Sequence, residues 1–554
     1  MAKLHSSSAC GAPLTDNAAR FLGFAFASAD MLFEIDPDGT VVFAMGAVQR
    51  VLGIDQAAAM GCSWRDLVAE SDHDLVAALI SGLSTADRRG PVKIEMQSRS
   101  GRKIRKFAGF SACRLPQVAP NVSCVISLGQ AIGGAQVSPG DGQDGMHDQT
   151  GFMAATRQLL NSAREAGLDL DLELVELKGL QEAADHAEGE DAQVMLRKVA
   201  AAVRAESFFG HGAAKLGDDQ FAVVRNRADS PDHLLNRLQK AASAAGAEVD
   251  ANSACLSLAP EAATLHTMRA LRFALDSFLK SGPQKGKAAF QTVLENTVME
   301  ANAFTSLVRE KRFQLVFQPV VELASADLQY FETLVRLEPD HSPAKAIRLA
   351  EELELIEDLD MAVVDRVIKK LKSQGNSRLR LSTNISARSL AQAGFMTNFL
   401  KLISVETALS DRLIFEITDS SAFEDLDLAN TGIQRIRQHG FEVCLDDFGA
   451  SGASVSNLRA LSVDSVKIDG QYAKDVAGSG RDTALVRHLT QLCDELGVAT
   501  IAEMVETPEA ATALEELGVR YGQGWRFGRP GPEPVYEKPT AATKKRVGES
   551  ESWR

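Results

Sequence analysis

The sequence predicts an α/β protein of several domains that ends in a (β/α)8 barrel. Between residues 313 and 530, eight short apolar runs rich in β-branched residues alternate with helical stretches. Nearly every run carries an acidic or polar residue toward its C-terminal end, where such barrels assemble their active sites. A Gly-, Gln- and Asp-rich segment at residues 129–147 predicts a flexible linker, and the length of 554 residues allows about three to five domains.

The composition is that of a globular protein and limits its partners. Hydrophobic residues make up 45% and charged residues 24% of the chain. A net charge of -15 argues against nucleic acid or an anionic membrane as the main partner. A small anionic ligand remains compatible with this charge, because bound divalent cations can reverse the local sign.

Cysteine usage and hydropathy predict a cytoplasmic location. The seven cysteines form no C-x-x-C pair and no metal-ligand spacing, which favours reduced thiols. No apolar run approaches the roughly 18 residues that cross a bilayer. The first residues have no apolar core of a signal peptide.

The first segment, residues 18–128, predicts an α+β domain. Two strand-like runs are joined by the turn sequence Asp36-Pro37-Asp38-Gly39, short helical segments follow, and three further strand-like runs close the segment. This order resembles a PAS sensor domain. His73 stands near a predicted helix start, where a surface histidine is favoured over a haem ligand.

The second segment, residues 148–291, resembles a GGDEF (diguanylate cyclase) domain of α/β fold with a degenerate active site. Its signature hairpin reads Gly217-Asp218-Asp219-Gln220-Phe221. Such a cyclase holds two magnesium ions with acids and reads guanine with an Asn and an Asp. Here Glu176 stands at the first acid position, Lys178 at the second and Ala184 at the Asn position, so we do not expect cyclase activity. Binding of GTP as a regulatory input and a packing or dimerisation role both stay open.

The third segment, residues 297–535, carries eight motifs in order on the predicted barrel strands. They are Gln318-Pro319, Glu332-Thr333-Leu334 with Arg336, Asn384-Ile385-Ser386, Glu416-Ile417-Thr418-Asp419, Asp446-Asp447-Phe448-Gly449, Lys467-Ile468-Asp469, Glu503-Met504-Val505-Glu506 and Gln523-Gly524. Together they resemble the EAL family of cyclic-di-GMP phosphodiesterases. Any one of these motifs alone would be a weak signal.

The residue types fit hydrolysis of a phosphodiester. Two divalent ions about 3.5–4 Å apart can activate water and stabilise the charge that develops on phosphate. Mg²⁺ and Mn²⁺ prefer oxygen ligands, which carboxylates and an amide carbonyl provide. Adjacent acids such as Asp446 and Asp447 after an apolar strand are costly unless cations neutralise them.

The family resemblance implies a role for each matching residue. Glu332, Asn384, Glu416 and Asp446 would hold one ion, and Asp446 would bridge to a second ion with Asp447 as a further ligand. Glu503 would hold or deprotonate water, and Lys467 would orient that water. Gln318 and Arg336 would contact the nucleotide, Gln523 would complete the second site's hydrogen bonds, and Asp419 and Glu506 would support the loop after the fifth strand.

Several positions depart from the family pattern without removing an ion ligand. Asp419 is one methylene shorter than the usual Glu, the loop at residues 449–454 differs, Met504 replaces Gly, and Thr333 replaces Ala. We therefore favour an active Mg²⁺- or Mn²⁺-dependent phosphodiesterase that yields linear pGpG and is regulated by the two N-terminal domains. The alternative is a catalytically weak or silent cyclic-di-GMP receptor or scaffold. A homodimer and a disordered tail at residues 536–554 are also expected.

Overall fold

The computed structural model divides into two compact units, Met1–Val298 and Met299–Arg554, and the boundary falls within helix α10 (Pro283–Arg309). It describes residues 29–85, 87–97, 106–128, 144–187, 189–228, 234–258, 262–338, 342–373, 378–418, 426–449, 454–474, 476 and 480–539. The predicted linker therefore lies mostly outside the described residues. The predicted domain boundaries within the first unit stay predictions.

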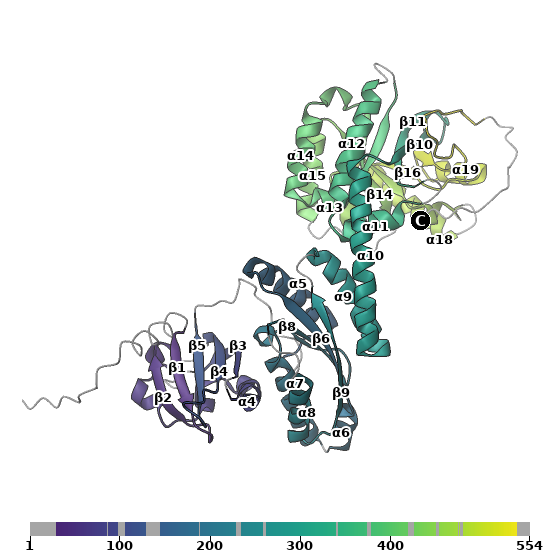
Figure 1. The fold of residues 1–554 in the computed structure, drawn as a ribbon. Helices are drawn as coiled ribbons and strands as arrows, with labels where there is room; N and C mark the ends of the chain where they lie inside the picture. The colour runs from purple at the N-terminus through teal and green to yellow at the C-terminus, as the bar shows by residue number, and fades with distance from the viewer. Residues whose placement is uncertain are drawn as a thin grey trace, which may run out of the picture. The chain divides into compact units, whose positions relative to one another are not determined.

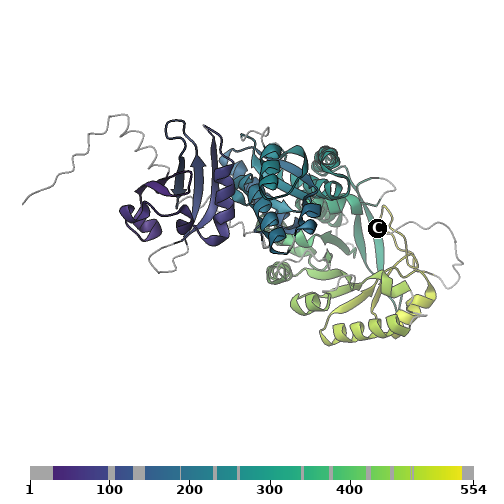
Figure 2. The same ribbon diagram turned by 90° about the horizontal axis from the view of Figure 1, so that it is seen from below.

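The first unit begins with a five-stranded antiparallel sheet of order β2-β1-β5-β4-β3, whose strands lie side by side (Figure 2). Its apolar face packs against short helices, and Trp64 and Leu67 are buried there. The expected order of two strands, helices and three strands is present. The elements are β1 (Met31–Ile35), β2 (Val41–Gly46), α2 (Val48–Leu52), α3 (Gln56–Ala59), η1 (Trp64–Leu67), η2 (Glu70–Asp72), α4 (His73–Ser81), β3 (Arg88–Met96), β4 (Lys106–Cys113) and β5 (Val122–Ser127).

A four-stranded antiparallel sheet of order β7-β8-β6-β9 completes the first unit. Strand β6 is central and its burial is nearly continuous, because helices pack on both of its faces. The assignment of these two sheets to PAS and GGDEF domains stays a prediction. The elements are α5 (Gln149–Ala166), β6 (Leu170–Lys178), α6 (Leu180–His186), α7 (Glu190–Ala205), η3 (Phe208–Gly210), β7 (Ala213–Lys215), β8 (Gln220–Asn226), α8 (Leu234–Ala244), β9 (Asp250–Leu258) and α9 (Thr264–Ser281).

The second unit is a closed eight-stranded barrel, which confirms the predicted architecture. Each of the eight apolar runs singled out in the sequence contains one strand. The strands are β10 (Gln314–Glu322), β11 (Leu328–Arg336), β12 (Leu381–Ile385), β13 (Leu413–Thr418), β14 (Glu442–Phe448), β15 (Ser465–Ile468), β16 (Ala499–Ala502) and β17 (Tyr521–Gln523).

One strand departs from a regular (β/α)8 barrel. Strand β10 is antiparallel to both of its neighbours, β11 and β17, whereas the other neighbouring pairs are parallel. The connection from β10 to β11 is too short for a crossover helix, and a short connection can join only antiparallel strands. Because β10 is reversed, Gln318 reaches the functional end of the barrel from the middle of its strand rather than from its C-terminal end.

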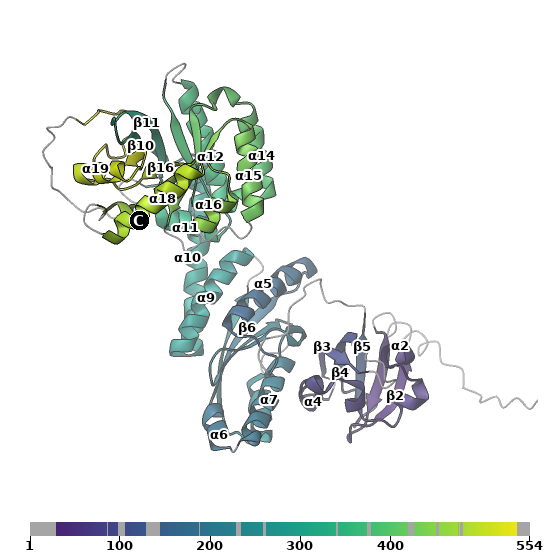
Figure 3. The same ribbon diagram turned by 180° about the vertical axis from the view of Figure 1, so that it is seen from behind.

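Helices enclose the barrel. Helices α12, α14 and α15 cover one flank, and α18 and α19 cover another (Figures 1 and 3). The outward side chains of the strands pack beneath them, as Phe415 and Val466 do. The helices are α11 (Ala344–Glu352), α12 (Ile356–Ser373), α13 (Ala387–Leu390), α14 (Ala393–Ser404), η5 (Thr407–Leu409), α15 (Leu426–Gln438), α16 (Ser454–Ala460), α17 (Gly470–Lys474), α18 (Gly480–Glu495) and α19 (Pro508–Glu516).

The chain after the last strand corrects the expected tail. Gly531 exchanges backbone hydrogen bonds with Phe317 of β10, and the Tyr536 hydroxyl donates to the carbonyl of Ala326 at 2.7 Å. Lys538 pairs with Asp327 at 3.0 Å. Proline and polar residues suggested disorder, but contacts with the hairpin between β10 and β11 order residues 536–539. Residues 540–554 lie outside the described residues.

Two further sequence expectations concern cysteines and membrane spans. Six cysteines belong to the described residues, and all of them are free thiols. Within the part of the chain that the structure describes, no helix has both the length and the apolar character needed to span a bilayer.

Candidate active site

One buried lysine lies at the centre of five carboxylates inside the barrel. Lys467 extends inward from β15, is 1% exposed, and contacts four of these acids. Its Nζ lies 3.0 Å from Glu332, 3.2 Å from Glu416, 3.1 Å from Asp446 and 2.8 Å from Glu503. The fifth acid, Asp447, follows Asp446 on β14. We call Glu332, Glu416, Asp446, Asp447 and Glu503 the acidic ring.

Strand geometry explains why these acids meet. Strands β11, β13, β14 and β15 run in the same direction around the barrel, and side chains alternate between its inside and outside. In the register between β12 and β13, Asn384 lies directly opposite Glu416. Five successive strands, β11 to β15, therefore bring one residue each to a single interior layer: Glu332, Asn384, Glu416, Asp446 and Lys467.

Amide side chains hold Glu332 in place. Its Oε2 accepts hydrogen bonds from Gln523 at 2.6 Å and Lys467 at 3.0 Å, and its Oε1 accepts one from Asn384 at 3.1 Å. Burial opposes ionisation of Glu332, but Lys467 and these hydrogen bonds outweigh it and lower the pKa of its carboxyl. Glu332 is therefore held as a carboxylate.

The other acids of the ring are driven toward protonation. Burial, together with neighbouring carboxylates, raises the pKa of Glu416 to about 8 and that of Asp447 to about 6, although Lys467 opposes both shifts. Burial likewise raises the pKa of Asp446, and raises that of Glu503 well above its usual range. Conversely, the surrounding acids overcome the effect of burial on Lys467 and raise the pKa of its ammonium group. One lysine is thus insufficient to balance five acids.

The donor atoms fit divalent cations. Carboxylate oxygens of Glu332, Glu416 and Asp446 lie within 4.8 Å of one another, and so do those of Asp446, Asp447 and Glu503. Asp446 belongs to both groups, as a bridging ligand must. Oxygen-only donors suit Mg²⁺ or Mn²⁺, and cations would remove the excess negative charge. The residues present therefore fit the two-ion site that the sequence predicted.

The backbone at the ends of β14 and β16 takes a left-handed conformation. Asp447 has φ 54° and Met504 has φ 53°, a region that non-glycine residues seldom occupy. Met504 stands where the family pattern has Gly, so the substitution noted in the sequence falls on a strained position. Its side chain fills the space beside Gly470, where an added Cβ would lie 2.3 Å from Met504.

The loop after β14 is anchored at its first residue. Gly449 has φ 100°, and its carbonyl accepts a hydrogen bond from the Tyr472 hydroxyl at 2.8 Å. Residues 450–453 and Asp419, the predicted support of this loop, lie outside the described residues. Glu506, the other predicted support, is exposed in the connection between β16 and α19.

The predicted substrate-binding residues occupy different depths. Gln318 is 1% exposed, donates to the Gly528 carbonyl at 3.2 Å, and accepts from Gln523 at 3.2 Å. Arg336 ends β11, is partly exposed, and donates to the Val335 carbonyl at 3.0 Å. Gln318 and Gln523 thus belong to the hydrogen-bond network around Glu332, whereas Arg336 lies nearer the surface.

Sequence reasoning missed two buried residues that hold the site. The Tyr330 hydroxyl donates to Glu416 at 3.2 Å, and Asp360 of α12 accepts from the Ser386 backbone at 2.9 Å and the Ser389 hydroxyl at 2.6 Å. The turn that Asp360 holds comes directly after the strand that carries Asn384. Strand periodicity could have indicated Tyr330, because it lies two residues before Glu332 and so on the same face.

The acids of the second sheet in the first unit do not converge in this way. Asp219 accepts hydrogen bonds from the backbone of Gly179 at 3.2 Å and Gln181 at 2.8 Å. Glu176 lies 3.7 Å from the exposed Lys178, and the Gln220 amide donates to the Phe278 carbonyl at 3.3 Å. The loss of cyclase activity and the binding of GTP stay predictions.

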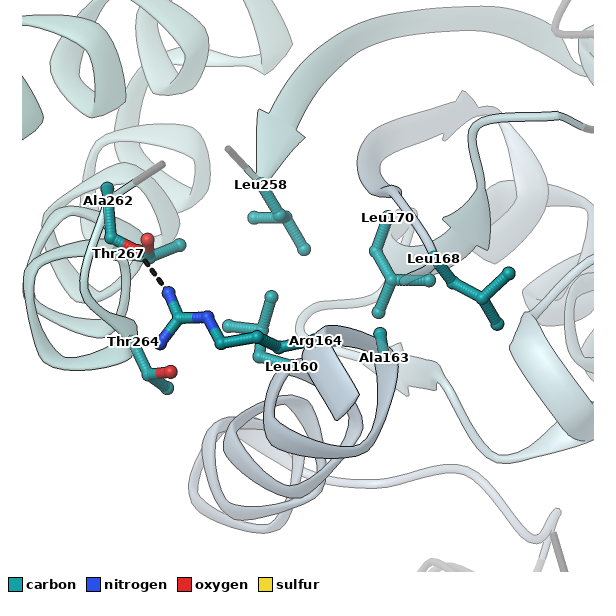
Figure 4. Close-up of a pocket in the computed structure, with 9 residues that line it drawn as sticks. All are labelled: Leu160, Ala163, Arg164, Leu168, Leu170, Leu258, Ala262, Thr264 and Thr267. Carbon is teal, nitrogen blue, oxygen red and sulfur yellow. Dashed lines mark hydrogen bonds between the residues drawn. The ribbon is translucent and has the colours of Figure 1, made fainter. Parts of the chain in front are cut away.

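A small hollow in the same sheet domain offers no reactive group. Its lining is mostly aliphatic, and its one charged residue, Arg164, donates to the Ala262 carbonyl (Figure 4). The hydroxyl of Thr264 donates to Asn161, and that of Thr267 donates to the Ala263 carbonyl. The barrel interior therefore remains the candidate active site.

Comparison with known proteins agrees with this choice. The family model described as the EAL domain matches residues 301–530. "Cyclic di-GMP phosphodiesterase PdeB" of Shewanella oneidensis is 32% identical over 252 residues, which are 44% of this chain and 29% of that protein. "Cyclic di-GMP phosphodiesterase NbdA" of Pseudomonas aeruginosa is 25% identical over 422 residues, which are 73% of this chain and 54% of that protein.

A solved structure and the lengths of the relatives complete the comparison. The EAL domain protein of Listeria monocytogenes EGD-e is 28% identical and covers 41% of this chain and 92% of that chain, with a TM-score of 0.38. The matches span 29% and 54% of the two curated relatives, so the chain covers only about a third to a half of their lengths. The stretch that matches the EAL domain model, residues 301–530, is the stretch that holds the closed barrel and its acidic ring.

Proposed function

We propose that this chain is a metal-dependent phosphodiesterase that hydrolyses cyclic-di-GMP to linear pGpG. The observation that carries the proposal is the convergence of five carboxylates on one buried lysine inside the barrel. The names of two curated relatives, both cyclic di-GMP phosphodiesterases, support the choice of substrate.

Two groups of ligands would hold the ions. Glu332, Glu416 and Asp446 with Asn384 form the first group, and Asp446, Asp447 and Glu503 form the second. Bound Mg²⁺ or Mn²⁺ supplies Lewis acidity and offsets the negative charge of a phosphodiester under attack. With cations in place, the carboxyls whose pKa values are raised lose their protons and become ligands.

The chain's own residues account for proton movement and charge. Water would attack phosphorus, and the bond to one ribose oxygen would break. That oxygen would take up a proton from solvent, in exchange for the proton lost by the attacking water, and leave as the hydroxyl of the linear product. Glu503, which is partly exposed and contacts Lys467, would accept the proton of the attacking water. Lys467, which holds its proton tightly, offsets the charge that develops on the phosphate oxygens.

Residues around the ring position the substrate and the ligands. Arg336 at the end of β11 presents a cation that would contact the nucleotide. Gln523 donates to Glu332 and is itself held by Gln318, so the two amides would act on the substrate through that ligand. The N-terminal unit would regulate turnover, with GTP as one input, within a cytoplasmic homodimer.

The test is direct hydrolysis by the full chain. Cyclic-di-GMP is incubated with purified protein and Mg²⁺ or Mn²⁺, and pGpG is measured by chromatography, with Glu332→Ala as the matched inactive variant. Formation of pGpG by the wild type alone supports the proposal. Binding of cyclic-di-GMP without any pGpG from the wild type would leave the receptor alternative in its place.

A further inference from the structure

Beneath the acidic ring lies a second interior layer, which we call the barrel plug. It consists of six buried side chains from six strands: Val320, Tyr330, Ile414, Cys444, Ile501 and Tyr521. Five of them stand two positions before a residue of the ring or of its amide partners, as Tyr330 precedes Glu332 and Ile414 precedes Glu416. Because strand side chains alternate with a period of two, the plug lies one layer below the site.

Tyr330 connects the two layers. Its side chain is packed among the apolar residues of the plug and is 4% exposed, yet its hydroxyl donates to Oε1 of Glu416 at 3.2 Å. Strand β12 lies between β11, which carries Tyr330, and β13, which carries Glu416, so the bond crosses the barrel interior rather than joining neighbouring strands. Packing of the barrel interior alone would not require a hydroxyl group at this position.

The hydrogen bond divides the two oxygens of Glu416 between two partners. Oε1 accepts from Tyr330 below, and Oε2 lies 3.2 Å from Lys467 within the ring. Glu416 is 0% exposed, so water cannot replace a lost donor from bulk solvent. The carboxylate can therefore present Oε2 to the ring without rotating.

We propose that Tyr330 is a positioning residue that fixes the Glu416 carboxylate for the ion held by Glu332, Glu416 and Asp446. The inference rests on the proposed function for the identity of that ion as Mg²⁺ or Mn²⁺. Groups that hydrogen-bond to metal ligands orient them, and loss of such a group costs about 10- to 100-fold in metal affinity. Tyr330 is thus expected to act on ion binding first, and on turnover through it.

The experiment measures binding of Mn²⁺ alone to the full chain. Bound metal is first removed with EDTA, and the free Mn²⁺ that remains at each addition is then measured by electron paramagnetic resonance. Tyr330→Phe keeps the ring and removes only the hydroxyl. We expect its affinity for Mn²⁺ to fall about 10- to 100-fold. The matched control is Tyr521→Phe, since Tyr521 belongs to the same plug but stacks its ring under Arg520 at 5.0 Å. This control is expected to bind Mn²⁺ like the wild type.

A double variant separates positioning from packing. If the hydroxyl acts through Glu416, Tyr330→Phe has no further effect on Mn²⁺ affinity once Glu416→Gln is present. Unchanged affinity in Tyr330→Phe, an equal loss in both phenylalanine variants, or additive losses in the double variant would each overturn the inference. A melting temperature measured in EDTA verifies that each variant folds.

The outcome also separates this inference from the proposed function. Weaker Mn²⁺ binding in Tyr330→Phe, with no pGpG from the wild type, would support the positioning role and remove the enzymatic proposal. Hydrolysis by the wild type, together with unchanged Mn²⁺ dependence in Tyr330→Phe, would support the enzymatic proposal and overturn the positioning role. Failure of the wild type to bind Mn²⁺ would overturn both the inference and the ion-dependent mechanism.

Discussion

The barrel and the four-stranded sheet of the first unit use the same residue types in opposite ways. In the barrel, five carboxylates surround the buried Lys467 and cannot all be neutralised by it. In the sheet, the Asp219 carboxylate accepts hydrogen bonds from two backbone amides, and Glu176 forms an ion pair with the exposed Lys178. Acids at strand ends therefore become a candidate ion site only where closure of the barrel brings them together and removes water.

Loss of the carboxylate shared by both ligand groups should have the largest effect. Asp446→Asn removes a charge from each group, and an ion of this kind contributes several kcal/mol to charge stabilisation. We expect hydrolysis of cyclic-di-GMP to fall by about 10³-fold, which corresponds to roughly 4 kcal/mol. The matched change in the sheet, Asp219→Asn, should leave the rate within about twofold. Comparable losses in both variants would erase the distinction between the two regions.

Removal of the central lysine should reveal the excess charge of the ring. In Lys467→Met the four carboxylates lose the ammonium group that all of them contact, and breaking a buried ion pair costs about 3–5 kcal/mol. The melting temperature of the barrel in EDTA should fall. Addition of Mn²⁺ should raise the melting temperature of the variant by more than it raises that of the wild type. A melting temperature insensitive to Lys467→Met would show that the acids are not electrostatically strained.

The ring should also make stability depend on pH. Glu416 has a pKa raised to about 8 in the folded barrel against 4.5 as its ordinary value, so the folded chain binds more protons between these limits. Stability without metal therefore falls as pH rises from about 4.5 to 8, and Asp360, with a pKa raised to about 7, adds to this fall between about 3.8 and 7.

Melting temperatures between pH 5 and pH 8 check this expectation. Mn²⁺ needs the deprotonated Glu416, so the gain in melting temperature from Mn²⁺ over EDTA should widen toward pH 8. Asp360 is outside the ion ligands, and its contribution should persist with Mn²⁺ present. A gain from Mn²⁺ that is constant with pH would contradict the assignment of Glu416 as a ligand.

The smallest effect is expected in the sheet. Asp219→Ala leaves the amides of Gly179 and Gln181 without their acceptor, and the loss of such a capping acceptor costs about 1 kcal/mol. The melting transition of the first unit should shift by a few degrees, with no dependence on Mn²⁺. A Mn²⁺-dependent shift in this variant would instead indicate that Asp219 is an ion ligand.

Much of the barrel could be predicted because its signals are local. Each strand is a short apolar run that local pattern predicts, and the resemblance of the eight motifs to a known family named Glu332, Asp446 and Lys467 as site residues. Contacts of residues 536–539, such as that of Tyr536 with Ala326, were not predicted because local composition does not encode distant partners, and the expectation for residues 540–554 stays a prediction. The loop expectations at Asp419 and residues 450–453 lie outside the described residues and stay predictions.

The sequence by itself determined the eight strands, the order of the motifs and the excess of acids over bases at the strand ends. Only the tertiary structure decided that β10 runs antiparallel, that Lys467 contacts four acids, and that Tyr330 bonds to Glu416 across the interior. The reason is physical. Side-chain periodicity is a property of each strand, but which strands face one another depends on closure and register of the whole barrel.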